Sequence, residues 1–297
     1  MSATMELPIA DKKIDTTTTL VVAITIVGWA SAFPAIRAGL DAFGPLELGA
    51  LRFTIAAVPA AILLAIFRPA LPKWNEIWRF ATGGIVFVAL YTALLNYGEL
   101  TVSAGAASFI INVSPILTAI FAVVFLSERF PLVAWIGTFV SFAGIGIIAL
   151  GEGEGFGFEP GALLILGAAF CTSFNTIVQK PLFARHKPLT VSAWNMVIGA
   201  LALSPALPNA LHQAGTASFE GLSAAIYLGV VPSLIVYGSW AITLSRLPAS
   251  RASNFLYCVP PVATIIGFLW LGEVPGTLGI IGGVLALGGV ALVNLKR

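Results

Sequence analysis

Long apolar runs separated by short polar loops are the feature that most constrains this chain. A helix needs about 20 mostly apolar residues to cross a bilayer, and only helices or closed barrels satisfy their backbone hydrogen bonds in lipid. Charged residues make up 9% of the 297 residues, against about 25% in soluble domains. The sequence therefore predicts an all-α integral membrane protein with ten transmembrane helices. They are expected over Thr18–Leu40, Leu46–Phe67, Phe80–Tyr97, Ser103–Leu126, Leu132–Leu150, Ala162–Val178, Val191–Ala210, Leu222–Leu244, Ala252–Leu271 and Leu278–Leu295.

Lys and Arg gather on one side of these predicted spans. With the N-terminus in the cytoplasm, all but two of the 15 Lys and Arg residues lie on the cytoplasmic side. The predicted external loops instead carry acids such as Glu99 and Glu220. Cytoplasmic loops are the ones enriched in Lys and Arg, so we expect both termini to be cytoplasmic in a bacterial-type inner (plasma) membrane. The net charge of +2 gives no reason to expect a nucleic-acid partner.

The second half of the sequence repeats the first. At an offset of 145 residues, Pro115 aligns with Pro260 and Glu128 with Glu273. At an offset of 143, Arg37 aligns with Lys180. Five spans are an odd number, so the second copy crosses the membrane in the opposite direction. We expect two inverted five-helix repeats, residues 1–150 and 151–297, an arrangement common in transporters with a pocket between the halves.

Uncharged polar and aromatic side chains within the spans are the candidates for lining such a pocket. Polar groups inside lipid are costly, so each one needs a reason to be there. For any single residue the alternative is an interhelical hydrogen bond or a buried aromatic. The candidate cavity residues are Trp29, Tyr91, Asn96, Ser108, Asn112, Tyr237, Trp240, Asn254 and Tyr257.

Arg52 is the charged side chain that lies well inside a predicted span. It could bind a substrate carboxylate, or it could be structural and anchor Glu47 or an exposed carbonyl. Pro34, Pro115 and Pro260 mark candidate helix breaks or hinges, because a proline leaves a carbonyl free one turn earlier. A simple kink is the alternative.

The residue types that are absent from the predicted spans limit the kinds of transport and catalysis that the chain can support. No Asp, Glu or His lies well inside a predicted span, whereas proton-driven carriers need a titratable group at depth. We therefore expect facilitative rather than proton-coupled transport. Cys171 and Cys258 have no His partner within the spans, which argues against an enzyme, a metal site or a cofactor. A zwitterion fits what remains, since amides, hydroxyls and aromatic faces can hold its two charges.

Three sequence blocks resemble a known family. They are "GWASAFPAIRAGL" at 28–40, "LRF" at 51–53, and the Pro…Leu-x-Glu block that ends at Glu128 and again at Glu273. The chain resembles the EamA family of the drug/metabolite transporter superfamily, and within it the inner-membrane exporters of aromatic and other neutral amino acids. The resemblance implies a cavity surrounded by helices one to four and six to nine, with helices five and ten at the periphery.

We therefore expect a carrier that exports neutral amino acids by alternating access, with the lipid bilayer and a small-molecule substrate as its partners. The alternatives are an exporter of other small metabolites or organic cations, and a passive channel or lipid scramblase. Gly137 and Ser141 place small residues on one face of the fifth span. Such a face packs closely against another helix, either within one chain or in a homodimer, and the sequence leaves both open.

Overall fold

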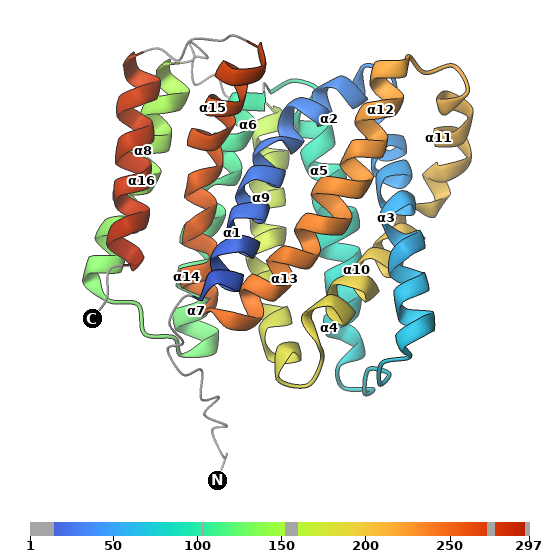
Figure 1. Ribbon diagram of the computed structural model, residues 1–297, viewed down its shortest axis with the longest axis horizontal. Helices are drawn as coiled ribbons and strands as arrows, with labels where there is room; N and C mark the ends of the chain where they lie inside the picture. Colours follow the sequence, from blue (N-terminus) through green and yellow to red (C-terminus); the bar gives the residue numbers. More distant parts are fainter. Residues whose placement is uncertain (1–14, 103, 152–159, 272–276, 295–297) are drawn as a thin grey trace.

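The computed structural model describes residues 15–102, 104–151, 160–271 and 277–294, and every regular element within these ranges is helical (Figure 1). The first half contains α1 (Thr16–Ala30), α2 (Ala32–Leu40), α3 (Pro45–Phe67), α4 (Ile77–Ala81), η1 (Thr82–Leu90), α5 (Tyr91–Gly98), α6 (Ala104–Ile111), α7 (Ser114–Leu126) and α8 (Leu132–Gly151). The second half contains α9 (Pro160–Gln179), η2 (Lys180–Ala184), α10 (Pro188–Leu203), η3 (Ser204–Ala206), α11 (Leu207–Ala214), α12 (Phe219–Leu228), η4 (Gly229–Ile235), α13 (Val236–Arg246), α14 (Ala249–Asn254), η5 (Phe255–Cys258), α15 (Val259–Leu271) and α16 (Thr277–Asn294).

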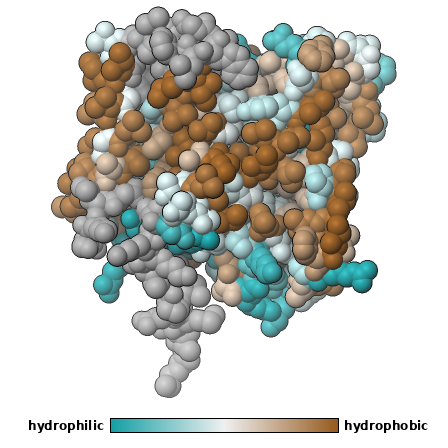
Figure 2. All heavy atoms as spheres, in the orientation of Figure 1, coloured by the Kyte–Doolittle hydropathy of each residue, from teal (hydrophilic) through white to brown (hydrophobic). Residues whose placement is uncertain are grey.

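Within the described ranges, seven helical segments are long and apolar enough to cross a membrane. They are Thr16–Leu40, Pro45–Phe67, Ile77–Gly98, Ala107–Leu126, Pro160–Ala184, Pro188–Ala214 and Phe219–Arg246. Two shorter apolar helices, Leu132–Ile147 and Ile280–Val293, lie within the predicted fifth and tenth spans. Figure 2 shows hydrophobic side chains across the middle of one face and hydrophilic ones gathered at its edges. The all-helical membrane architecture follows from these segments, and the count of ten spans stays a prediction.

Three of the apolar segments are interrupted just before a proline. α1 gives way to α2 at Ser31, ahead of Pro34. The α6–α7 segment breaks at 112–113, ahead of Pro115. Between α14 and α15 the chain tightens into the 3₁₀ turn η5, ahead of Pro260. A proline has no N–H to donate and its ring crowds the preceding turn, which accounts for the position of each interruption.

α8 and α16 pack against each other at one edge of the molecule (Figure 1). Ser141 Oγ of α8 donates to the Ala286 carbonyl of α16 at 2.9 Å. A Cβ added to Gly137 would lie 2.7 Å from the Gly289 carbonyl oxygen, and one added to Gly144 would lie 2.6 Å from that of Gly282. The small residues of the fifth span therefore bring two helices of the same chain into close contact.

Two basic side chains make matching contacts at opposite faces of the molecule. Arg37 Nη1 donates to the carbonyls of Glu99 and Val102 at 3.1 and 3.5 Å, at the end of α5. Lys180 Nζ donates to the carbonyls of Leu244 and Leu247, at the end of α13. The donors are 143 residues apart in sequence and the acceptors 145 apart, the same offsets that relate the two halves of the sequence.

The two faces can be named from these contacts. α13 ends beside the start of α1, because Arg246 pairs with Asp15 at 2.9 Å. We call this side, where α1 begins and α16 ends (Figure 1), the N-terminal face. α5 ends on the other side, which we call the opposite face. The Lys180 contact therefore lies at the N-terminal face and the Arg37 contact at the opposite face.

Candidate functional site

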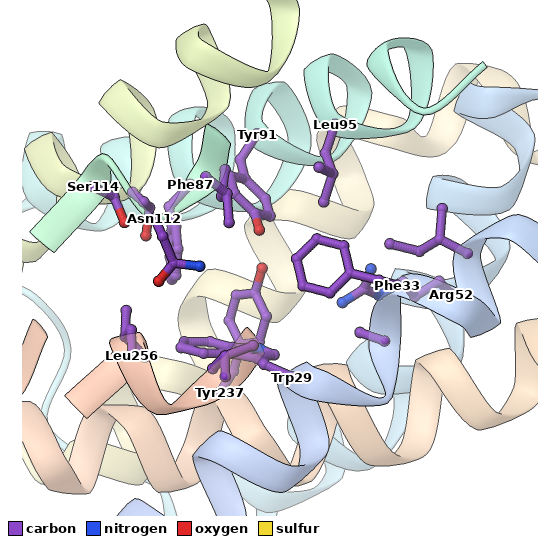
Figure 3. Close-up of a pocket in the computed structure, with 15 residues that line it drawn as sticks. Trp29, Phe33, Arg52, Phe87, Tyr91, Leu95, Asn112, Ser114, Tyr237 and Leu256 are labelled. Carbon is purple, nitrogen blue, oxygen red and sulfur yellow. The ribbon is translucent and has the colours of Figure 1, made fainter. Parts of the chain in front are cut away.

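A pocket with an empty volume of ≈ 640 Å³ lies among the helices of both halves (Figure 3). Pockets for small molecules are mostly apolar with a few polar groups. The pocket is lined by Trp29, Ala32, Phe33, Ile36, Arg52, Phe87, Tyr91, Leu95, Ile111, Asn112, Ser114, Thr172, Tyr237, Leu256 and Val259. Its mixed lining suits a small organic molecule that carries a few polar groups.

Arg52 provides the positive charge of the pocket. It sits on α3 with a side chain that is 3% exposed. Its Nε donates to Ser233 Oγ at 2.6 Å, and its guanidinium lies 5.0 Å from the centre of the Phe53 ring. Within the described part of the chain its two terminal nitrogens have no hydrogen-bond partner, and no carboxylate pairs with it. Figure 3 shows the group beside Phe33 at one end of the pocket, where it could bind a carboxylate through two parallel hydrogen bonds.

Aromatic rings form the middle of the pocket. Trp29 meets Tyr237 edge-on with ring centres 5.9 Å apart, and Phe87 lies 4.9 Å from Tyr237 and 6.0 Å from Tyr91. The hydroxyls of Tyr91 and Tyr237 point toward each other into the open space (Figure 3). Rings of this kind bury an apolar side chain and also attract a cation to their faces.

Asn112 and Ser114 form a second polar end of the pocket, away from Arg52 (Figure 3). Asn112 stands where α6 stops, and its Nδ2 donates to the Ser108 carbonyl at 2.6 Å. Its Oδ1 is buried without a hydrogen-bond partner. The break before Pro115 thus leaves a buried acceptor without a partner beside this end of the pocket.

Four of the nine candidate cavity residues line this pocket, namely Trp29, Tyr91, Asn112 and Tyr237. Two others lie just outside it. Trp240 packs on Trp29 with ring centres 5.5 Å apart. Ser108 accepts the hydrogen bond from Asn112 through its carbonyl.

The remaining three candidates, Asn96, Asn254 and Tyr257, do not line the pocket. Asn96 donates to the Pro45 carbonyl at 2.8 Å. Asn254 accepts from Thr138 Oγ1 at 2.8 Å and donates to the Ser250 carbonyl at 2.7 Å. Tyr257 is fully buried against Ile145 and the residues around it. The contacts of these three residues are those that pack neighbouring helices together.

Several lining residues were not among the candidates because they are apolar. Phe33 and Ile36 follow Trp29 at helical spacing, and Phe87 and Leu95 flank Tyr91 by one turn on each side. Residues three and four apart share a helix face. The sequence signal was therefore present as two helical stripes centred on the predicted aromatics.

Glu99 corrects one sequence-based expectation. The sequence places it in an external loop, but its side chain, just past α5, is only 1% exposed, and neither carboxylate oxygen has a hydrogen-bond partner among the described residues. Burial raises the pKa of the Glu99 carboxyl to about 8, against the opposing effect of the Arg37 and Arg52 cations. Glu99 lies past the predicted span Phe80–Tyr97, and it is a buried acid at this end of the molecule. Glu273 lies outside the described residues.

A family model identifies the fold and its class. The model of the EamA-like transporter family matches residues 16–150 and, a second time, residues 159–295. The chain belongs to the EamA-like transporter family. This confirms the resemblance inferred from the sequence, and the chain is accordingly a multi-pass membrane transporter. A crystal structure of 22% identity superposes on this EamA-like transporter with a TM-score of 0.75, covering 94% of this chain and 96% of the other. It shows the same fold.

Named relatives of this EamA-like transporter connect it with amino-acid export. The "Probable terminal-alkyne amino-acid exporter" of Streptantibioticus cattleyicolor is 37% identical over 273 residues, 92% of each chain. "Uncharacterized transporter YdfC" of Bacillus subtilis is 34% identical over 90% of this chain and 88% of its own. The "Probable amino-acid metabolite efflux pump" of Salmonella typhimurium is 26% identical over 90% of this chain and 91% of its own.

Proposed function

We propose that this protein exports neutral amino acids, aromatic ones included, across a bacterial inner membrane by alternating access. The observation that carries the proposal is that a guanidinium whose two terminal nitrogens have no hydrogen-bond partner among the described residues shares one pocket with an aromatic chamber. An α-amino acid has a carboxylate, an ammonium group and a side chain, and the pocket offers a complement to each.

The roles follow from the geometry. The terminal nitrogens of Arg52 receive the carboxylate, since guanidinium and carboxylate match in charge and shape. The ammonium group lies among the hydroxyls of Tyr91 and Tyr237, which point toward each other in the chamber (Figure 3). The apolar side chain packs on Trp29 and the other rings, where burial of apolar surface contributes about 25 cal/mol per Å².

The pocket itself is lined by no Asp, Glu or His among the described residues. Proton coupling requires a titratable group that meets the substrate or its path, so we propose that movement through the pocket is facilitative. The positive-inside distribution of Lys and Arg supports the N-terminal face as the cytoplasmic one. Arrangement as two inverted five-helix repeats is supported by the matching Arg37 and Lys180 contacts.

A transport panel tests the proposal. The purified protein is reconstituted into liposomes, and uptake of radiolabelled L-phenylalanine is competed with neutral, acidic and basic amino acids, with 2-phenylethylamine and with tetraphenylphosphonium. We expect saturable uptake, inhibited best by neutral amino acids with apolar side chains. Inhibition by tetraphenylphosphonium alone would assign the pocket to organic cations and refute the proposal.

A further inference from the structure

The pocket is asymmetric: some residues of the first half line it, whereas the residues 143 positions later in the sequence do not. Ala32, Ile36 and Arg52 line it, but the residues 143 positions later, Asn175, Gln179 and Asn195, do not. Other related pairs contribute both members, as Trp29 and Thr172 do. The open space therefore reaches the first set of residues and stops short of its counterparts.

Those three counterparts form an unusual buried cluster. Asn175, Gln179 and Asn195 are 0%, 2% and 3% exposed. Both polar atoms of Asn175, the Nε2 of Gln179 and the Oδ1 of Asn195 have no hydrogen-bond partner in the described part of the chain. Buried polar atoms nearly always have partners, so four orphaned atoms on three amides call for an explanation.

Two of the amides, Gln179 and Asn195, come together against Gly83 of η1. Asn175 and Gln179 stand one turn apart on α9, and residues at this spacing share a face. A Cβ added to Gly83 would lie 2.1 Å from Asn195 Oδ1 and 2.7 Å from Gln179 Nε2. Two helices of the second half thus aim their amides at a π-helical segment of the first half. Segments of this kind occur often at functional sites.

We propose that Asn175, Gln179 and Asn195 form a second head-group subsite of the carrier, which holds the α-carboxylate and α-ammonium of an amino acid when the pocket is open to the N-terminal face. The amide N–H groups supply donors for the carboxylate, and the amide oxygens supply acceptors for the ammonium. In the present conformation α9, α10 and η1 close over the subsite. The proposal rests on the proposed function for its ligand, and on burial and orphaned atoms for its location.

Two substitutions of matched shape separate this role from a structural one. Gln179→Leu and Asn195→Leu replace each amide by a branched apolar side chain and remove the polar atoms. Because Gln179 Nε2 and Asn195 Oδ1 have no partner among the described residues, the thermal midpoint of the ligand-free protein should stay or rise in both variants. Asn254→Leu is the control, since both polar atoms of Asn254 are bonded, and its midpoint should fall. A fall in all three variants would show that the amides hold the fold and would overturn the proposal.

Transport measured separately from each face tests whether the subsite binds the amino acid. In liposomes sorted by protein orientation, the KM for L-phenylalanine should rise about tenfold or more in Gln179→Leu when substrate is added at the N-terminal face. Substrate added at the opposite face should show an unchanged KM. Equal KM changes from both faces, or none, would contradict a subsite that loads from one side.

Cysteine labelling tests the location of the subsite even if amino acids are not the substrate. Cysteines are introduced at Asn175→Cys and Gln179→Cys in a background lacking Cys171 and Cys258, and treated with a membrane-impermeant maleimide. Labelling from the N-terminal face alone is expected. Labelling from the opposite face alone, or from neither face, would overturn the subsite. Failure of the wild type to move any amino acid would instead refute the proposed function.

Discussion

Removing the guanidinium of Arg52 should weaken binding only of substrates that carry a carboxylate. Arg52→Leu deletes the charge but keeps an apolar side chain in a site that is 3% exposed. The side chain gives one hydrogen bond to Ser233 and leaves its terminal nitrogens for the ligand. Ser233→Ala is the matched control, because it removes that bond and keeps the charge.

The size of the effect follows from the bonds lost. A hydrogen bond to a charged group contributes about 1.5–3 kcal/mol, and each 1.4 kcal/mol changes an equilibrium constant about tenfold. Two parallel bonds from Arg52 to one carboxylate therefore predict a loss of about a hundredfold or more in affinity for L-phenylalanine. Ser233→Ala should cost less than about tenfold, since the guanidinium is still present.

The assay compares two ligands on the same variants. Inhibition constants for L-phenylalanine and for 2-phenylethylamine, which lacks the carboxylate, are measured by competition in proteoliposomes. Arg52→Leu should raise the first and leave the second within about threefold, so that the double-mutant cycle isolates the carboxylate contact. Equal losses for both ligands would mean that Arg52 is structural and would refute this reasoning.

Three further predictions concern the frame around the pocket. Lys180→Met should favour opening at the N-terminal face, and Arg37→Met should favour opening at the opposite face, because each removes one of the matched contacts. The two variants should therefore change maleimide labelling of a cysteine in the pocket in opposite directions. Changes in the same direction would contradict this role of the matched contacts. Gly144→Leu should lower the thermal midpoint by several degrees, because its Cβ would meet the backbone of α16, whereas a leucine at the open position Gly288 should not. Since the pKa of Glu99 is raised to about 8, the unfolded chain ionises first. Wild-type stability should therefore fall as pH rises from about 4.5 toward 8 and then level off; a slope that persists in Glu99→Gln would assign it to another group.

Much of the frame could be predicted because lipid imposes strict rules on sequence. Hydrophobic length located the seven segments that are long and apolar enough to cross a membrane, and Pro34, Pro115 and Pro260 each follow an interruption. The aromatic rings were found because Trp29 and Tyr237 lie in mid-span. These features depend on a residue and its near neighbours alone.

The details of the site depend on how each helix is rotated about its axis, which local sequence does not specify. Asn112 and Asn254 both lie within apolar segments, yet one faces the pocket and the other bonds to Thr138 of α8. Glu99 follows a span by a single residue and lies under packed helices rather than in water. The amides of Asn175 and Asn195 stand out only because polar atoms of theirs are buried without a hydrogen-bond partner among the described residues, which the sequence does not reveal.

Counterflow tests most directly whether this protein is an alternating-access carrier of neutral amino acids. Liposomes are loaded with unlabelled L-phenylalanine and diluted into a trace of the radiolabelled compound. A carrier exchanges inner for outer substrate one at a time, so the label should rise above its equilibrium level and then decline, and Arg52→Leu should show no such overshoot. Label that climbs steadily to equilibrium in the wild type, as through an open channel, would contradict the account.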